Sequence, residues 1–159
     1  MRSWPASRTA RSWRTRLGLE ASDRVAVLAA VAGTLPAALA SREPSHAVSA
    51  LLIHGALDGL APIGGGWSRR RGPNGELRGR TLSLDETAAR WREIDRFPPG
   101  IGGTAVAART LPDGGHSWPG MPAGPGWREP VSQEFDAAEE ICRFAVPLAI
   151  PAAERRRDR

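Results

Sequence analysis

The chain has 159 residues, of which 41% are hydrophobic and 25% are charged, and its formal net charge is +5. This length suits a single domain with a sizeable core, and the composition excludes collagen, a coiled coil and a disulfide scaffold. Cys142 is the only cysteine, so no internal disulfide can form. No run of about 18 uncharged apolar residues occurs, which excludes a membrane bundle and predicts no membrane partner.

The basic charge is carried by 22 Arg residues and no Lys. Arg codons are GC-rich and Lys codons are not, so the net charge reflects base composition at least as much as any partner. The Arg residues cluster in residues 1–18, 69–71 and 155–159. Because no helix-turn-helix, zinc or RNA-binding signature accompanies these clusters, we expect solvated termini and a solvated loop, with no nucleic-acid partner. An exported or nucleic-acid-binding basic protein is the weaker alternative.

Residues 25–40 allow two interpretations. The segment is apolar, follows Arg-rich sequence and ends in an Ala-x-Ala sequence, like a signal peptide with its cleavage site. Glu20 and Asp23, however, place acidic side chains just before the apolar run. We therefore favour a buried strand at 25–32 followed by a turn, and the compartment stays unassigned.

Further elements alternate along the chain. Residues 48–54 are predicted to form a buried strand, and residues 55–82 a loop rich in Gly, Pro and Arg. Ser83 should begin a helix, since Glu86 three residues later completes a capping box. Residues 104–111 alternate like a third strand.

A long loop at 112–131 follows the third strand, and we expect Ser132 to open a last helix. Residues 147–159 are expected to be a frayed tail. Strands and helices of these lengths in this order predict an α/β fold with three parallel strands and flanking helices. The strand at 25–32 would present a long apolar edge, so we also expect it to favour aggregation or an edge-strand dimer.

Two candidate chemical groups follow strands. Asp58 comes three residues after Gly55, which closes one strand, and His116 lies in a Gly-rich loop after the next strand. In open parallel sheets, ligands bind beyond the carboxyl ends of the strands. A His that acts as a general base needs a carboxylate to fix its tautomer and stabilise the imidazolium ion. An Asp and a His on two loops can also be ordinary turn residues.

Other polar residues suggest simpler roles. His54 is expected to be structural, with its side chain facing away from the loop that turns at Gly55. His46 should be solvated, and Cys142 should lie in the core on the apolar face of the last helix. Trp118 could either line an acyl pocket or pack over His116. No metal site and no cofactor are expected, since the three His are dispersed and no Cys or acid pair stands at ligand spacing.

Several short sequences resemble the C-terminal half of esterases of the polyhydroxybutyrate depolymerase type, which include feruloyl and acetylxylan esterases. The most specific is the Gly-Gly-His-Ser-Trp-Pro-Gly sequence of residues 114–120, followed by the His-Gly and Asp of residues 54–58. The other matching segments are residues 22–26, 31–36, 86–91 and 136–144.

The resemblance implies a partial α/β-hydrolase domain at 17–146, an off-pattern Arg-rich segment at 1–16 and a basic tail at 147–159. It also implies hydrolysis of a small or polymeric carboxylic ester through a serine acyl-enzyme, with Asp58 as the triad acid and His116 as the triad base. Trp118 would line the pocket.

The nucleophile elbow, Gly-x-Ser-x-Gly, is missing, and Ser68 lies in an Arg-rich loop without the strand-to-helix context. We therefore expect the chain to be inactive alone. A non-catalytic gene remnant or an interaction module is the alternative function.

A change of reading frame would account for the missing elbow. Arg16 and Leu17 match the end of the elbow segment in this type of esterase. With permitted third bases, the codons of residues 5–15 read in the neighbouring frame can spell Gly-Phe-Ser-Asn-Gly-Ala-Ile-Met-Ala-Tyr. We therefore expect a frame change near Thr15 in the parent gene, with the nucleophilic Ser encoded near position 8.

Overall fold

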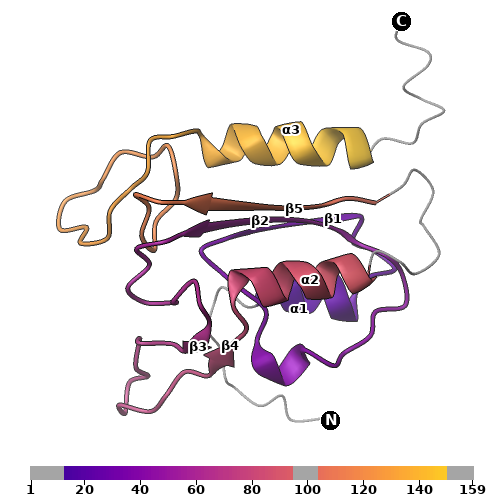
Figure 1. Ribbon diagram of the computed structural model, residues 1–159, viewed down its shortest axis with the longest axis horizontal. Coiled ribbons are helices and arrows are strands. Elements are labelled where there is room, and N and C mark those ends of the chain that lie inside the picture. The colour runs from indigo at the N-terminus through magenta and orange to yellow at the C-terminus, as the bar shows by residue number, and fades with distance from the viewer. Residues whose placement is uncertain (1–12, 95–103, 150–159) are drawn as a thin grey trace, which may run out of the picture.

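The computed structural model describes residues 13–94 and 104–149. The chain forms three layers, with a β-sheet between helices α1 (Trp13–Glu20) and α2 (Leu84–Ile94) on one face and α3 (Ala137–Ala149) on the other (Figure 1). Helix α1 begins inside the segment expected to be off-pattern and contains Arg14 and Arg16 of the N-terminal Arg cluster. The other Arg residues of that cluster, and the cluster at 155–159, lie outside the described residues.

The sheet confirms the predicted α/β class. Strands β1 (Val27–Val31), β2 (Ser49–Gly55) and β5 (Val106–Leu111) are parallel and lie in the order β1-β2-β5. Every residue of the central strand β2 is buried, which agrees with the apolar run at its centre, residues 50–53. Strand β1 lies within residues 25–32, so the strand interpretation of this segment is confirmed with narrower bounds.

Helix α2 begins where the capping box places it. The Glu86 side chain accepts the backbone N–H of Ser83 (2.8 Å), and the Ser83 hydroxyl accepts the backbone N–H of Glu86 (3.0 Å). Its buried face centres on Trp91, which is fully enclosed. A Cβ on Gly18 of α1 would lie 2.8 Å from the Trp91 ring, so a glycine in α1 lets the two helices approach.

The start of α3 corrects the sequence prediction. The helix begins at Ala137, and Asp136 caps it by accepting the backbone N–H groups of Ala138 (2.7 Å) and Glu139 (3.2 Å). Ser132 instead lies buried in the preceding loop, where its carbonyl accepts the N–H of Gly120 (2.9 Å). The helix also extends over residues 147–149, which were expected to belong to the tail.

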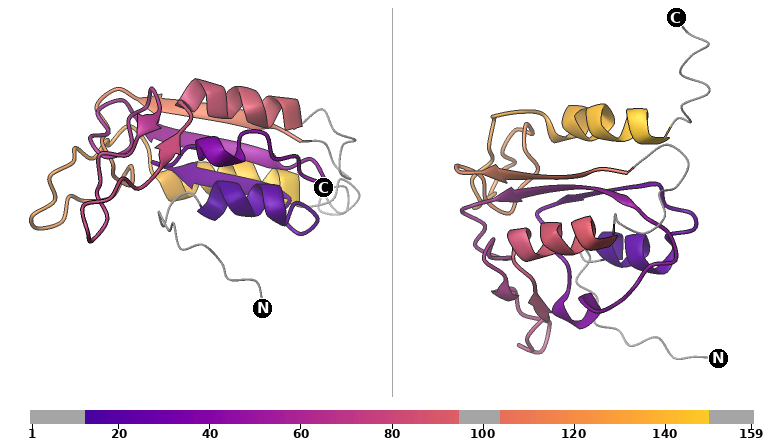
Figure 2. Two further views of the ribbon diagram at one scale, coloured as in Figure 1. Left: turned by 90° about the horizontal axis from the view of Figure 1, so that it is seen from below. Right: turned by 45° about the vertical axis from the view of Figure 1, so that its right-hand side comes forward.

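The segment 55–82 was expected to be a loop, but part of it forms strands. It contains a short antiparallel pair, β3 (Gly66–Trp67) with β4 (Arg80–Thr81), and a 3₁₀ helix, η1 (Ala37–Leu39), precedes it in the chain. The pair and the loops that follow β2 and β5 lie at the same end of the sheet (Figures 1 and 2). This end is the one at which the parallel strands terminate.

Two apolar clusters hold the layers together. One lies between the sheet and α1 and α2, and it includes Trp91, Leu52 and Val48. The other lies between the sheet and α3, and it includes Leu51 and Ile53 with Phe144 at its margin. The alternation of side chains along β2 sends its residues to the two clusters in turn. Within the described ranges, no helix is long and apolar enough to cross a membrane.

Candidate functional site

The register of the sheet brings Asp58 and His116 together. Gly55 at the end of β2 pairs with Leu111 at the end of β5, so the two strands terminate side by side. Asp58 follows β2 and His116 follows β5, and Asp58 Oδ2 lies 2.7 Å from His116 Nδ1. Both residues are buried. The two predicted site residues therefore form a hydrogen-bonded carboxylate–imidazole pair.

Each oxygen of the Asp58 carboxylate has its own partners. Oδ1 accepts the backbone N–H groups of Leu60 (2.9 Å) and Ala61 (2.7 Å), which form a tight turn around the side chain. Burial by itself raises the pKa of Asp58, but hydrogen bonds from His116, His54 and the Ala61 N–H outweigh it and hold that pKa well below its usual range. Asp58 is therefore a stable anion at neutral pH.

The orientation of His54 differs from the sequence prediction. Its side chain faces the turn after Gly55, and its Nε2 lies 2.8 Å from the Ala61 carbonyl oxygen and 3.3 Å from Asp58 Oδ2. Because both neighbours of Nε2 are acceptors, Nε2 must carry a proton. Nδ1 is buried without a partner, so the neutral ring with the proton on Nε2 is the form that leaves no donor unpaired. The expectation that His54 faces away from this turn was wrong.

Glycines allow the two loops to pack backbone against backbone. A Cβ on Gly55 would collide with the carbonyl groups of Gly114 and Gly115. The Gly114 carbonyl also accepts the N–H of Leu57 at 2.9 Å. Small residues at these positions are what let the Asp58 loop and the His116 loop approach within hydrogen-bonding distance.

Sequence reasoning missed Glu129. One of its carboxylate oxygens, Oε2, accepts the backbone N–H of Gly59 (3.1 Å) and that of His116 (3.1 Å). Glu129 lies in the return part of the loop after β5, 70 residues from Gly59 in sequence. A lone Glu in a Gly- and Pro-rich loop carries no local pattern that would have indicated this contact.

No nucleophile hydrogen-bonds His116 within the described part of the chain. The Ser117 hydroxyl donates to the Pro130 carbonyl (2.7 Å), and the Ser68 hydroxyl donates to the Leu60 carbonyl (3.2 Å). Position 8, where the other reading frame would encode the Ser, lies outside the described residues. The Nδ1 atom of His116 is engaged by Asp58, so Nε2 is the nitrogen left to exchange a proton.

Trp118 is 37% exposed, two residues beyond His116. Cys142 lies exposed on α3, so the expectation that it belongs to the core was wrong. Arg69, Arg70 and Arg71 are exposed, as expected for a solvated loop. Among the described residues, no group of three or more His, Cys, Asp or Glu side chains could hold a metal ion.

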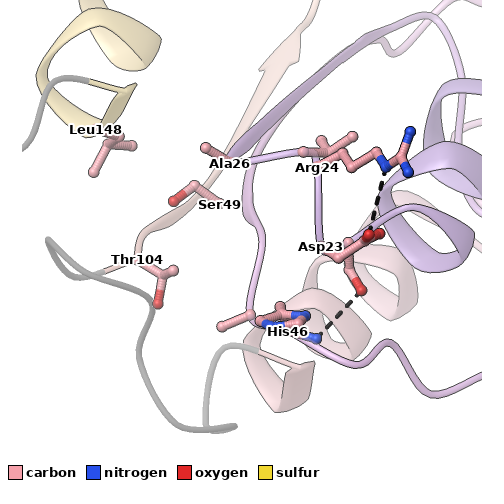
Figure 3. Close-up of a pocket in the computed structure, with 10 residues that line it drawn as sticks. Asp23, Arg24, Ala26, His46, Ser49, Thr104 and Leu148 are labelled. Atoms are coloured by element: carbon pink, nitrogen blue, oxygen red, sulfur yellow. Dashed lines mark hydrogen bonds and ion pairs between the residues drawn. The ribbon is translucent and has the colours of Figure 1, made fainter.

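A surface pocket lies at the opposite ends of the strands (Figure 3). It is lined by residues just before β1 and β5, by residues before and at the start of β2, and by Leu148 of α3. Its charged side chains, Asp23 and Arg24, pair with each other at 3.5 Å and are 54% and 85% exposed. Asp58 and His116 are not among the lining residues, so this pocket is separate from the carboxylate–imidazole pair.

Comparison with known proteins identifies no relative: no family model, no curated protein and no solved structure matches the chain. The function of the pair must therefore be argued from its geometry and from the sequence.

Proposed function

We propose that Asp58 and His116 are the acid and base of a serine ester hydrolase with an α/β-hydrolase fold of the polyhydroxybutyrate depolymerase type. The observation that carries the proposal is the 2.7 Å contact between Asp58 Oδ2 and His116 Nδ1 at the carboxyl ends of adjacent parallel strands. This arrangement fixes the His116 tautomer, with the proton on Nδ1 and the lone pair on Nε2.

The proposed chemistry begins at His116 Nε2. This atom removes the proton from a serine hydroxyl as the serine oxygen attacks the ester carbonyl, and the Asp58 carboxylate stabilises the imidazolium ion that forms. The imidazolium then donates its proton from Nε2 to the departing alkoxide, which leaves an acyl-enzyme. Water, activated by the same nitrogen, releases the carboxylic acid and regenerates the serine.

In this proposal, the nucleophilic serine is encoded in the neighbouring reading frame, upstream of the Arg16 codon. The chain as it stands would then hold the acid and base without turnover. Trp118, beside His116 in sequence and partly exposed, would line the space for the acyl group. The substrate class is a carboxylic ester, small or polymeric.

The experiment has two stages. Sequencing the gene shows whether the bases before the Arg16 codon can encode Ser-Asn-Gly in any frame. The upstream frame is then joined to the frame of this chain at the Arg16 codon, and the product, the joined-frame protein, is assayed with p-nitrophenyl butyrate. Its Asp58→Asn and His116→Ala variants are assayed beside it, with His46→Ala as a control at an exposed residue. We expect hydrolysis that falls by about 10⁴-fold with Asp58→Asn, and comparably with His116→Ala, while His46→Ala retains full activity.

Two outcomes would contradict the proposal. Hydrolysis that survives His116→Ala would show that the pair is not the acid–base machinery. A joined-frame protein that folds but hydrolyses no ester would favour the alternative, a non-catalytic interaction module built on the half-sheet.

A further inference from the structure

Glu129 connects the two loops that carry Asp58 and His116. The same oxygen, Oε2, accepts one N–H from each loop, that of Gly59 at 3.1 Å and that of His116 at 3.1 Å. Gly59 is the residue after Asp58, and the second N–H belongs to His116 itself. The carboxylate therefore contacts the backbone on both sides of the acid–base hydrogen bond.

The loops are shaped to admit this carboxylate. A Cβ on Gly59 would lie 2.9 Å from Glu129 Oε1, and a Cβ on Gly115 would lie 2.7 Å from Glu129 Oε2. Both approaches are closer than ordinary contacts allow, so any larger residue at either position would displace Glu129. Two glycines, one in each loop, thus leave room for one carboxylate.

The segment around Glu129 is itself anchored to the His116 loop. The carbonyl of Pro130 accepts the backbone N–H of Gly115 (2.8 Å) and the hydroxyl of Ser117 (2.7 Å). These two bonds flank His116 and hold residue 129 close to it.

We propose that Glu129 is a positioning residue. One of its carboxylate oxygens, Oε2, holds the Asp58 loop and the His116 loop in register. This role rests on the proposed function of the Asp58–His116 pair. Hydrogen bonds to a charged acceptor are stronger than those between neutral groups, so one carboxylate can restrain both loops without touching the reacting atoms.

The test uses NMR on the full 159-residue chain and needs no turnover. The Nδ1 proton of His116 reports the bond to Asp58 and is assigned by its loss in His116→Ala. Amide hydrogen exchange of Gly59 and His116 reports the bonds to Glu129. The Gly65 amide, which donates to the Pro62 carbonyl at 2.9 Å in another turn, is the internal reference.

Four variants separate the effect of the length of the Glu129 side chain from the effect of its charge. Glu129→Gln keeps the length and a carbonyl acceptor, whereas Glu129→Asp keeps the charge but is one methylene shorter. Glu129→Ala removes the acceptor, and Glu134→Ala is the control, since Glu134 is exposed and its carboxylate has no hydrogen bond or ion pair with the residues that the structure describes. In the Ala and Asp variants we expect exchange at both amides to rise about tenfold to a hundredfold and the His116 Nδ1 signal to weaken or vanish.

Glu129→Gln, which keeps the length but loses the charge, should show a smaller rise in exchange than Glu129→Ala or Glu129→Asp, and the Gly65 amide should not change in any variant. If Glu129→Ala unfolds the chain, the Gln and Asp variants decide the matter alone. Wild-type exchange and an intact Nδ1 signal in Glu129→Asp would overturn the proposal, as would unchanged values in a folded Glu129→Ala. A failure to find esterase activity would count against the proposed function and would leave this measurement standing.

Discussion

His54 and His116 share one oxygen of Asp58, with His54 Nε2 at 3.3 Å and His116 Nδ1 at 2.7 Å from Oδ2. The His54 Nε2 atom is also 2.8 Å from the carbonyl oxygen of Ala61, and the N–H of the same residue donates to Asp58 Oδ1. The imidazole of His54 thereby closes the turn that holds Asp58, with Nε2 as the donor. The N–H groups of Leu60 and Ala61 on Oδ1, together with His54, orient the Asp58 carboxylate so that Oδ2 faces His116.

The first prediction concerns the donor on His54. His54→Gln can place an amide N–H near the Ala61 carbonyl, whereas His54→Leu leaves that carbonyl without this donor. We expect His54→Leu to lower the free energy of unfolding by about 1–3 kcal/mol and His54→Gln to recover most of that loss. Urea unfolding measures both, with His46→Leu as the exposed control. Equal stability of the Leu and Gln variants would contradict the role assigned to the donor.

The second prediction concerns pH. The pKa of Asp58 is lower in the folded chain than the value of about 3.9 expected when unfolded. As the pH falls through about 3.9, Asp58 takes up a proton in the unfolded state before it does so in the folded state. The contribution of Asp58 to stability is therefore complete above about pH 5 and declines as the pH falls toward the pKa of the folded state.

Urea unfolding at pH 5 and pH 3 checks this difference. The wild type should lose at least about 1 kcal/mol more than Asp58→Asn over this interval, because the Asn variant lacks the titrating group. Asp113→Asn, a change at an exposed acid, should follow the wild type. Parallel losses in the wild type and Asp58→Asn would show that the carboxylate is not stabilised by folding.

The third prediction concerns the close approach of the two loops. Gly55→Ala would push a methyl group into the carbonyls of Gly114 and Gly115, so it should cost about 1–3 kcal/mol or more of stability. Gly64→Ala is the matched control, since nothing lies within 4 Å of a Cβ built there. It should change stability by less than about 1 kcal/mol. A Gly55→Ala variant as stable as the control would contradict the packing described for these loops.

The fourth prediction concerns the outer edge of β1. In the sheet formed by the described residues, β1 is an edge strand. The Ala32 N–H donates to Ile53 of β2, so by alternation the N–H of Ala29 faces away from β2. We expect concentration-dependent self-association through this edge, measured by analytical ultracentrifugation.

A substitution that removes the outward donor tests the edge. Ala29→Pro should reduce association, whereas Ala29→Thr, which keeps the N–H and suits a strand, should not. A wild-type chain that is a monodisperse monomer at all concentrations would show the prediction to be wrong.

Local patterns were enough to predict part of this molecule. The capping box of Ser83 and Glu86 is complete within four residues, so its sequence spacing already specifies its hydrogen bonds. The mostly apolar segment at 48–54 has the length and composition of a buried strand in a parallel sheet. The positions of Asp58 and His116 after two such strands made them candidate site residues. Their pairing was expected only from the resemblance to the esterases, because the sequence alone does not specify which strands are neighbours in the sheet.

Other features depend on contacts between distant segments. His54 points into the turn of Asp58 because the Ala61 carbonyl and the carboxylate attract its N–H, and strand alternation alone suggested the opposite. Asp136 rather than Ser132 caps α3 because the Ser132 backbone is engaged by Gly120, which lies 12 residues earlier. Glu129 reaches Gly59 across 70 residues of chain. Such hydrogen bonds form only when the whole fold brings donor and acceptor together, and no short sequence pattern encodes them.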